Sequence, residues 1–444
     1  MTSPSGHWLL GHVPALRRDP LGLLDQCSGA VVPLRLGKTV WLVLDARDVL
    51  HVLEQSEGVY TKGRAFRFGR KLYGDSLLVS EGDTHRQQVQ QVGGLFFRHA
   101  AKSFLQPAVE ITDTWLNRWR HGDTLDLWDS LIELTLAISS RAIFGSDYLP
   151  AWLSGREEGE ADRILRAYDI AMAHVAWQNF SMFPLPDWAP TPANRRYAQA
   201  IAALDRALVM SVEKREAGVD SGGFLVHLLA AHRANPEAFP MQRVRDQALI
   251  LMLGGYESTA TALCWTILLL SVHGEIREQL LAEISQVVTD LPEEDHVRSL
   301  RWTSQVFSES LRLYPPPWLI PRTAAIANTL PSGHRFLAGT SLFLSPWRTQ
   351  RDARYFSEPT RFDPERFSSV RSAEIVPGSY FPFGLGPRHC IGESIARQQA
   401  VLILATIFRR AEFRLQSGVL PVPKPLLTLR PALPVPVRID FFRR

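Results

Sequence analysis

The residues with the clearest capacity for chemistry lie in a glycine-rich loop around Cys390. The loop reads FGLGPRHCIG from Phe383 to Gly392, and a long apolar run follows it. Its glycines let backbone amides approach a ligand where side chains would collide. A thiolate in such a loop is a soft, strong donor for a transition metal such as iron. Taken alone, a single cysteine is more often a small buried hydrophobic residue.

Two other interpretations of this loop start from its glycines and its thiol. The Gly-x-Gly pair resembles a dinucleotide-binding turn, but His389 occupies the place of the third glycine and no strand-like apolar run precedes the loop. A catalytic cysteine would need a His and an Asn or Asp brought close by the fold, which the sequence does not exclude.

Taken whole, the loop resembles the haem-binding loop of the cytochromes P450. The resemblance implies that Cys390 is the axial thiolate ligand of haem b, and that backbone amides of the loop moderate the basicity of this thiolate. It also implies that the haem contacts His85, Arg322, Phe383, Gly384, Arg388, Cys390 and Gly392.

A second motif, GGYEST from Gly254 to Thr259, interrupts the longest helical pattern, residues 243–275. Each glycine in a helix interior costs about 1 kcal/mol relative to Ala. The helix therefore either ends here or opens beside a ligand, and the apolar pattern that resumes favours one kinked helix. The resemblance implies that Gly255 leaves space for O₂, while Glu257 and Ser258 deliver two protons through water.

Ser258 stands where the P450 family usually has threonine. It keeps the hydroxyl but lacks the methyl group that restrains the side-chain rotamer. We therefore expect proton delivery to be retained, with somewhat more release of peroxide than in a threonine enzyme.

The haem propionates require cations, and the resemblance assigns Arg388, Arg322 and His85 to them. Arginine suits a carboxylate because its guanidinium can donate two parallel hydrogen bonds. The family commonly has an arginine four residues after the histidine, whereas this chain has Val89. Arg86 is one candidate to compensate, and the question stays open at this point.

Glu309 and Arg312 are three residues apart, so they share one helix face and can form an ion pair. A proline-rich turn follows them, and Arg366 lies in a later FDPERF segment. This order resembles the family's buried ion-pair network. We interpret the three residues as structural support for the cysteine loop, because removing one member of a buried network leaves a charge unpaired.

The bulk properties are those of a globular protein that could bury a large core. The chain has 444 residues and a mass of 50.0 kDa, with 45% hydrophobic and 21% charged residues. A net charge of +4 without a nucleic-acid-reading motif argues against a nucleic-acid partner and suits an acidic protein partner. The three widely spaced cysteines argue against a disulfide framework and for a reducing compartment.

The amino terminus is polar, and its apolar run at residues 8–10 is far shorter than the roughly 20 residues of a membrane span. We therefore expect a cytoplasmic protein without a membrane anchor.

The predicted fold is mainly α with a small β-rich portion, in one P450-like domain over residues 1–444. Apolar periodicity predicts the β-rich part mainly at about 29–60 and 318–345, and the helical part mainly at about 85–315 and 391–410. The resemblance places haem between the 243–275 helix and the helix after Cys390. The proline-rich segment 183–192 is either a lid or a plain connection.

These features predict a haem-thiolate monooxygenase that inserts one atom of O₂ into an apolar organic substrate. The expected substrate is a terpenoid, polyketide or fatty-acyl skeleton of specialised metabolism. NAD(P)H-derived electrons would arrive through a ferredoxin or flavodoxin and its reductase, and the enzyme would be a monomer. The candidate pocket residues are Arg67, Trp177, Phe180, Leu251, Tyr256, Trp318 and Leu319.

Five alternatives remain on the sequence alone. Desaturation and oxidative coupling would use the same residues as oxygen insertion. A peroxygenase would not need the Glu257–Ser258 pair, so the presence of this pair counts against it. A cysteine hydrolase or a non-catalytic haem carrier would come from another class of protein.

Overall fold

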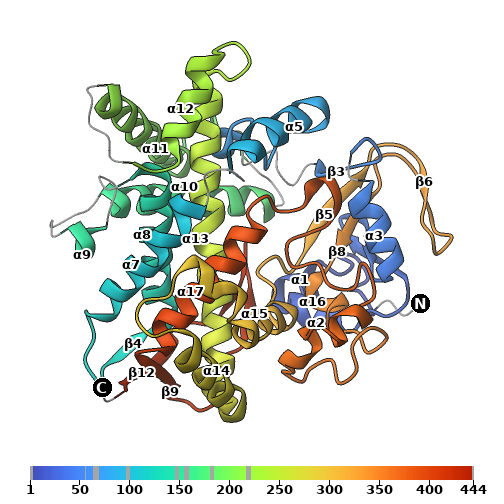
Figure 1. The fold of residues 1–444 in the computed structure, drawn as a ribbon. Helices are drawn as coiled ribbons and strands as arrows, with labels where there is room; N and C mark the ends of the chain where they lie inside the picture. The colour runs from blue at the N-terminus through green and yellow to red at the C-terminus, as the bar shows by residue number, and fades with distance from the viewer. Residues whose placement is uncertain are drawn as a thin grey trace.

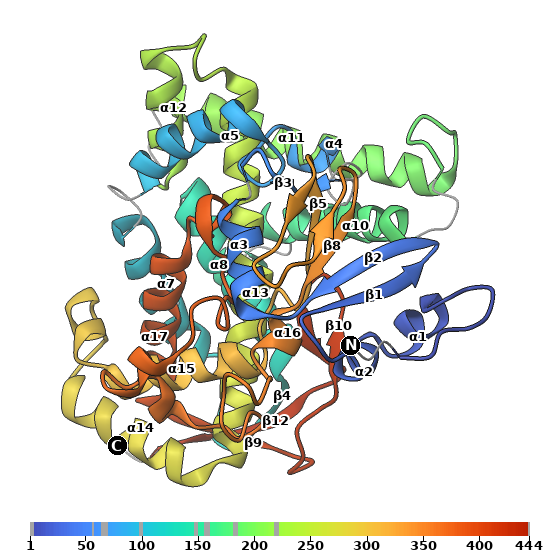
Figure 2. The same cartoon turned by 90° about the vertical axis from the view of Figure 1, so that its right-hand side faces the viewer.

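Helices form most of the molecule, and a small β-rich part lies to one side of them (Figures 1 and 2). The computed structural model describes residues 4–55, 57–63, 70–96, 101–145, 150–154, 160–180, 185–216 and 222–442. The predicted fold class, mainly α with a small β portion, is confirmed. The expected division of the chain, one domain over residues 1–444, stays a prediction.

The bounds of the helices follow in chain order. The α-helices are α1 Val13–Arg18, α2 Pro20–Asp25, α3 Ala46–Glu54, α4 Arg70–Tyr73, α5 Gly82–Gln88, α7 Gln106–Leu116, α8 Leu127–Phe144, α9 Ala151–Ser154, α10 Glu160–Phe180, α11 Pro192–Glu216, α12 Leu225–Ala234, α13 Met241–Val272, α14 Gly274–Val287, α15 Arg301–Leu313, α16 Pro346–Thr349 and α17 Glu393–Phe408. The short helices are the π-helices η2 Val89–Gly93 and η3 Ala101–Leu105 and the 3₁₀ helices η4 Glu294–Arg298, η5 Pro364–Phe367, η6 Arg371–Glu374 and η7 Gly386–Arg388.

The strands form four small sheets. They are β1 Val31–Leu36, β2 Lys38–Val43, β3 Tyr60–Thr61, β4 Thr124–Asp126, β5 Ile320–Ala324, β6 Asn328–Thr329, β7 Arg335–Phe336, β8 Ser341–Leu344, β9 Ala411–Leu415, β10 Pro423–Pro425, β11 Leu429–Pro431 and β12 Pro436–Phe441. The largest sheet has the order β1-β2-β8-β5-β3, and only its β2–β8 pair is parallel. The other sheets are β4-β12-β9, β10-β11 and β6-β7.

Helix α13 runs through the middle of the helical part and packs against α8 (Figure 1). It contains 32 residues, which corresponds to a length of about 48 Å. Buried, mostly apolar side chains of α13 occupy most sides of the helix, as expected for a helix inside a core. The helix continues through Gly254 and Gly255, so these glycines do not end it.

The second half of α13 is tied to the carboxyl-terminal strands through Trp265. The Trp265 indole stacks on the ring of Tyr314, with centroids 3.8 Å apart, and its Nε1 donates to the carbonyl of Leu429 at 2.6 Å. A buried indole usually needs such a partner for its N–H. This contact fixes β11 beside α13, although 164 residues separate Trp265 from Leu429.

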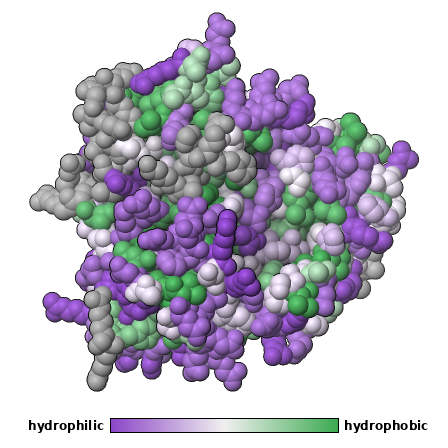
Figure 3. Space-filling model, viewed as in Figure 1, coloured by the Kyte–Doolittle hydropathy of each residue, from purple (hydrophilic) through white to green (hydrophobic). Residues whose placement is uncertain are grey.

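On the face shown in Figure 3, hydrophilic side chains predominate and apolar ones are interspersed among them. Within the described part of the chain, no single helix is long and apolar enough to cross a membrane. Helices α13 and α14 pass that test only when taken together, and they are bent by 111° at the break between them.

Candidate active site

The backbone of the Cys390 loop is closed by its own hydrogen bonds. The Cys390 amide donates to the carbonyl of Phe383 at 3.0 Å. Gly384 and Gly386 have φ angles of 73° and 69°, which side chains of L-residues rarely adopt. A Cβ atom on Gly386 would also lie 2.5 Å from the carbonyl oxygen of Leu53, so a glycine is needed where the loop meets α3.

The surroundings of the Cys390 thiol fit a metal ligand better than a nucleophile. Although the residue is exposed, it lies deep enough among protein atoms that burial raises the pKa of its thiol. Hydrogen bonds from the backbone at Gly392 and Glu393 act in the opposite direction. Reactive cysteines have lowered pKa values, whereas coordination to a metal deprotonates a thiol outright.

Contacts with α15 and α17 hold the residues before and after Cys390 in place. The Tyr380 hydroxyl donates to the carbonyl of Ser308 at 3.1 Å. Arg397 donates to the Ser308 hydroxyl at 3.1 Å and to Glu393 at 2.7 Å, and the Glu393 carboxylate also pairs with His389. The residues on both sides of Cys390 are therefore fixed by charged or hydroxyl groups.

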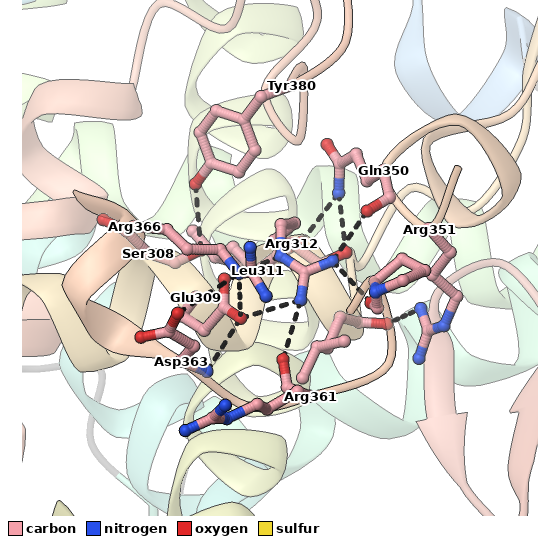
Figure 4. Close-up of polar contacts among 12 residues, drawn as sticks. Ser308, Glu309, Leu311, Arg312, Gln350, Arg351, Arg361, Asp363, Arg366 and Tyr380 are labelled. Atoms are coloured by element: carbon pink, nitrogen blue, oxygen red, sulfur yellow. Dashed lines mark hydrogen bonds and ion pairs between the residues drawn. The ribbon is translucent and has the colours of Figure 1, made fainter. Parts of the chain in front are cut away.

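Glu309, Arg312 and Arg366 meet in one buried network (Figure 4). Two nitrogens of Arg312, Nε and Nη2, each lie 2.7 Å from a carboxylate oxygen of Glu309, and both side chains are fully buried. Arg366 Nε lies 3.4 Å from Glu309 Oε1. The structure thus brings together the three residues that the sequence assigned to structural support.

Arg312 also connects separate backbone segments. It donates to the carbonyls of Gln350, Pro359 and Arg361 at 2.8, 2.8 and 3.0 Å. The Gln350 side chain then accepts a hydrogen bond from the amide of Phe381 at 2.9 Å, just before the cysteine loop. The network is linked through the Gln350 side chain to the backbone that precedes the loop.

Glu257 is held by residues from the distant β11 segment. The Thr428 hydroxyl donates to Glu257 Oε1 at 2.8 Å, and the Thr261 hydroxyl lies 3.1 Å from Thr428 Oγ1. Burial raises the pKa of the Glu257 carboxyl, while Thr428 and the Arg430 charge lower it. A carboxyl with a raised pKa keeps its proton closer to neutral pH, as an acid in a proton path requires.

The two glycines of α13 face different surroundings. A Cβ atom at Gly255 would lie 3.3 Å from the hydroxyl of Ser139 on α8, whereas one at Gly254 would meet no atom within 4 Å. Open space therefore lies beside Gly254, and the expected part of Gly255 in leaving room for O₂ stays a prediction. The Ser258 hydroxyl donates to the carbonyl of Gly254 at 2.8 Å.

An apolar cluster between α10, α11 and α13 contains part of the expected pocket. Tyr256 is buried there and packs edge-on against Tyr168, with ring centroids 5.6 Å apart, and Leu251 lies at the border of the same cluster. Trp177 is partly exposed at the end of α10. Arg67 and the side chain of Phe180 lie outside the part of the chain that the structure describes.

Trp318 and Leu319 lie in a different cluster from the other pocket candidates. Trp318 is buried with residues of α2 and β1, including Leu21 and Leu34, and its indole nitrogen donates to the carbonyl of Leu426 at 2.8 Å. Leu319 is partly buried against the same cluster. This packing gives both residues a role in the core beneath the sheet.

Four cationic or titratable side chains lie near Glu81, namely those of Arg388, Lys62, Arg322 and His85. Arg388 forms an ion pair with Glu81, and the Lys62 amide donates to the same carboxylate at 2.8 Å. Arg322 lies beside Lys62, because β3 and β5 pair with Thr61 opposite Thr323.

Burial makes this cluster electrostatically unusual. Burial first, and then the Arg388 charge, lower the pKa of Lys62 to about 7 and that of Arg322 to about 10. The pKa of His85 is lowered by burial as well, and its ring bonds to Glu57 at 3.0 Å. Arg388 Nε is buried without a hydrogen-bond partner among the described residues.

A group of neighbouring cations, together with an Arg388 N–H that has no acceptor among the described residues, fits an anionic ligand. The two propionates of haem would supply such anions, and Cys390 would supply the axial sulfur. The residues present therefore fit the cofactor that the sequence resemblance implies. Three residues near the candidate site, Lys62, Thr428 and Arg430, were not among the residues predicted from the sequence. Lys62 opens a segment, residues 62–71, that holds several lysines and arginines, and Thr428 and Arg430 carry no local motif.

Comparison with known proteins gives consistent matches. The model of the family described as Cytochrome P450 matches residues 1–437. Cyclooctat-9-en-7-ol 5-monooxygenase of Streptomyces melanosporofaciens is 32% identical over 94% of this chain and 90% of its own length. Pentalenene oxygenase of Streptomyces avermitilis is 29% identical over 91% and 89%. The crystal structure of the cytochrome P450DA heme domain superimposes with a TM-score of 0.89 at 23% identity, covering 100% of this chain and 98% of that chain, and it shows the fold alone.

Breaking the buried ion pair should strongly destabilise the protein. For Glu309→Gln we expect a loss of about 3–5 kcal/mol in the free energy of unfolding, because Arg312 and Arg366 lose their counter-charge. Glu358→Gln is the matched control, since it removes an exposed pair with Arg361 at 2.9 Å and should cost about 1 kcal/mol or less. Denaturant unfolding measures both. Equal losses for the two variants would contradict the structural role of Glu309.

Proposed function

Because the chain belongs to the cytochrome P450 family of haem-thiolate monooxygenases, we propose that it inserts one oxygen atom from O₂ into a terpenoid skeleton. The observation that carries this proposal is the agreement among relatives that align along about nine-tenths of the chain. One of them is named for oxidation of cyclooctat-9-en-7-ol and another for oxidation of pentalenene. The apolar cluster around Tyr256 supports a hydrocarbon-like substrate.

The proposed role of Cys390 is to ligate the haem iron through its thiolate. Haem bound there supplies the activation of O₂, and the chain positions the reacting groups. The buried Glu309–Arg312–Arg366 network, through Gln350, keeps the loop that carries the thiolate from shifting. Phe383 contributes its carbonyl to the closure of this loop.

The proposed role of Glu257 and Ser258 is to hold and transfer protons on the α13 side. Glu257 is buried, and its carboxyl is oriented by the Thr428 hydroxyl. Ser258 directs its single hydroxyl proton at the carbonyl of Gly254, next to the open space. It can pass a proton toward that space by rotating about χ1, which is easier for serine than for a β-branched threonine.

We further propose that the electrons derive from NAD(P)H and arrive from a separate ferredoxin or flavodoxin with its reductase, and that the enzyme works as a cytoplasmic monomer. P450 enzymes generally use redox partners, and the net charge of +4 suits an acidic electron donor.

The assignment of Cys390 predicts a spectroscopic signature. Reduced protein with CO should show the red-shifted Soret band that gives the family its name. Cys390→His should lose that band, whereas Cys27→Ala, which alters a buried cysteine outside the loop, should keep it. A red-shifted band that survives in Cys390→His would refute the assignment.

The coupling of NAD(P)H oxidation to product formation should change in opposite directions when Thr428 and Ser258 are substituted. Thr428→Val removes the donor to Glu257, so product per NAD(P)H should fall about fivefold, as for one lost hydrogen bond. Thr428→Ser keeps the hydroxyl and should stay near the wild-type value. Ser258→Thr should raise coupling and lower hydrogen peroxide release. Unchanged coupling in both Thr428→Val and Ser258→Thr would contradict the proton path.

The substrate class can be tested by optical titration. Cyclic terpenoid hydrocarbons and their monoalcohols should convert the iron from low spin to high spin, because they displace water from an apolar pocket. Fatty acids of similar carbon number serve as the comparison. A shift with the fatty acids and none with the terpenoids would replace the proposed substrate class while leaving the P450 assignment intact.

A further inference from the structure

Asp169 is an acidic residue of α10 whose carboxylate makes no hydrogen bond or ion pair with the residues that the structure describes. Its side chain is exposed, yet burial is the main reason that the pKa of its carboxyl is raised to about 6. Cys390 combines exposure and burial in the same way. Both side chains therefore border a space that protein atoms enclose, and not the outer surface.

The contact between α10 and α13 places Asp169 opposite Glu257. The ring of Tyr168, the residue before Asp169, packs edge-on against Tyr256, the residue before Glu257. Burial and then the Glu257 charge raise the pKa of Asp169, and burial and then the Asp169 charge raise the pKa of Tyr256. The two carboxyl groups thus approach one another from different helices, on either side of the tyrosine pair.

The part of α13 opposite Asp169 is the part that borders open space. Gly254, Glu257 and Ser258 are three and four positions apart, so they share one helix face. A Cβ atom at Gly254 would meet no atom within 4 Å. Asp169 therefore lies across from the helix face that carries the proposed proton path.

A carboxylate in this position requires a hydrogen-bond donor. Taking an ionised carboxylate out of water is costly unless a donor replaces its hydration. The cluster between α10, α11 and α13 is mainly apolar, and Arg430 acts on Asp169 through its charge without a hydrogen bond. The donor must therefore come from water or from a bound molecule.

The chemistry of the proposed substrate limits what that donor can be. A terpenoid skeleton of carbon, hydrogen and oxygen can donate a hydrogen bond only through an O–H group. The positive charge of Arg430 already acts on Asp169, so a neutral hydroxyl suits this carboxylate better than a second cation does.

From this placement we infer that Asp169 is a specificity-determining residue that accepts a hydrogen bond from a hydroxyl group of the substrate. The preferred substrate is then a terpenoid alcohol rather than the parent hydrocarbon. The inference deepens the proposed function and rests on it. It adds a polar anchor on α10 to a pocket that is otherwise apolar, and this anchor sets which carbon of the skeleton faces the haem side.

The test compares a cyclic terpenoid alcohol with the corresponding ketone, which has the same carbon skeleton and no O–H group. Both are titrated into the holoenzyme, and the change from low to high spin gives their dissociation constants. The wild-type protein should bind the alcohol about 10- to 100-fold more tightly, as expected for a hydrogen bond to a charged acceptor. It should also oxidise the alcohol mainly at one position.

Three variants separate the carboxylate from its surroundings. Asp169→Ala removes the acceptor, so the preference for the alcohol should fall to about threefold or less and the products should become a mixture of regioisomers. Asp169→Asn keeps an acceptor without the charge and should show an intermediate preference of about three- to tenfold. Asp290→Asn is the matched control at an aspartate whose side chain is 93% exposed, and it should behave as wild type.

Three outcomes would overturn the inference. One is an undiminished preference for the alcohol in Asp169→Ala. Another is an equal loss of affinity for alcohol and ketone, which would assign Asp169 to local packing. The third is an intact preference with more hydrogen peroxide released on both ligands, which would assign Asp169 to the proton path.

Failure of the proposed function would be seen separately. The comparison of alcohol with ketone can be made on whichever carbon skeleton changes the spin state of the iron. If fatty-acyl and not terpenoid skeletons cause the change, the proposed substrate class fails, and the preference for O–H over C=O on the skeleton that binds still decides the role of Asp169.

Discussion

The buried ion pair between Glu309 and Arg312 is the contact on which the cysteine side of the molecule depends. Neither side chain is exposed to solvent, so each charge requires the other. Arg312 uses its remaining donors on three main-chain carbonyls, and Gln350 extends the connection to the backbone before the cysteine loop. Charge compensation in the interior thereby fixes the place of a loop whose own glycines would leave it free to move.

A second group of charges surrounds Glu81. Arg388 forms an ion pair with the Glu81 carboxylate, the Lys62 backbone amide donates to it, and the side chains of Lys62 and Arg322 lie close to Arg388. Burial lowers the pKa of each of the three cations, which expresses the energetic cost of charging them there. Such a cost is typical of a functional site prepared for a ligand of opposite charge.

The orientation of Glu257 depends on a contact between segments that are remote in sequence. Trp265 anchors Leu429 to α13, and the residues on either side of Leu429 are Thr428 and Arg430, which act on Glu257. The core of the helical part and the orientation of the acid are therefore linked by one strand. Any change that loosened β11 would alter both.

The amino-acid sequence was sufficient to predict the family, the enzyme class and the predominance of helix, and all three are confirmed. It could do so because these features rest on short-range spacing: the glycines around Cys390 set one loop conformation, and the spacing of three positions from Glu309 to Arg312 sets one helix face. The packing of distant segments was needed to show that a Cβ atom at Gly254 would meet open space, that Trp318 packs in the core, and that Thr428 donates to Glu257. Those relations depend on how separate segments pack and balance their charges, and no local pattern encodes the distance between them.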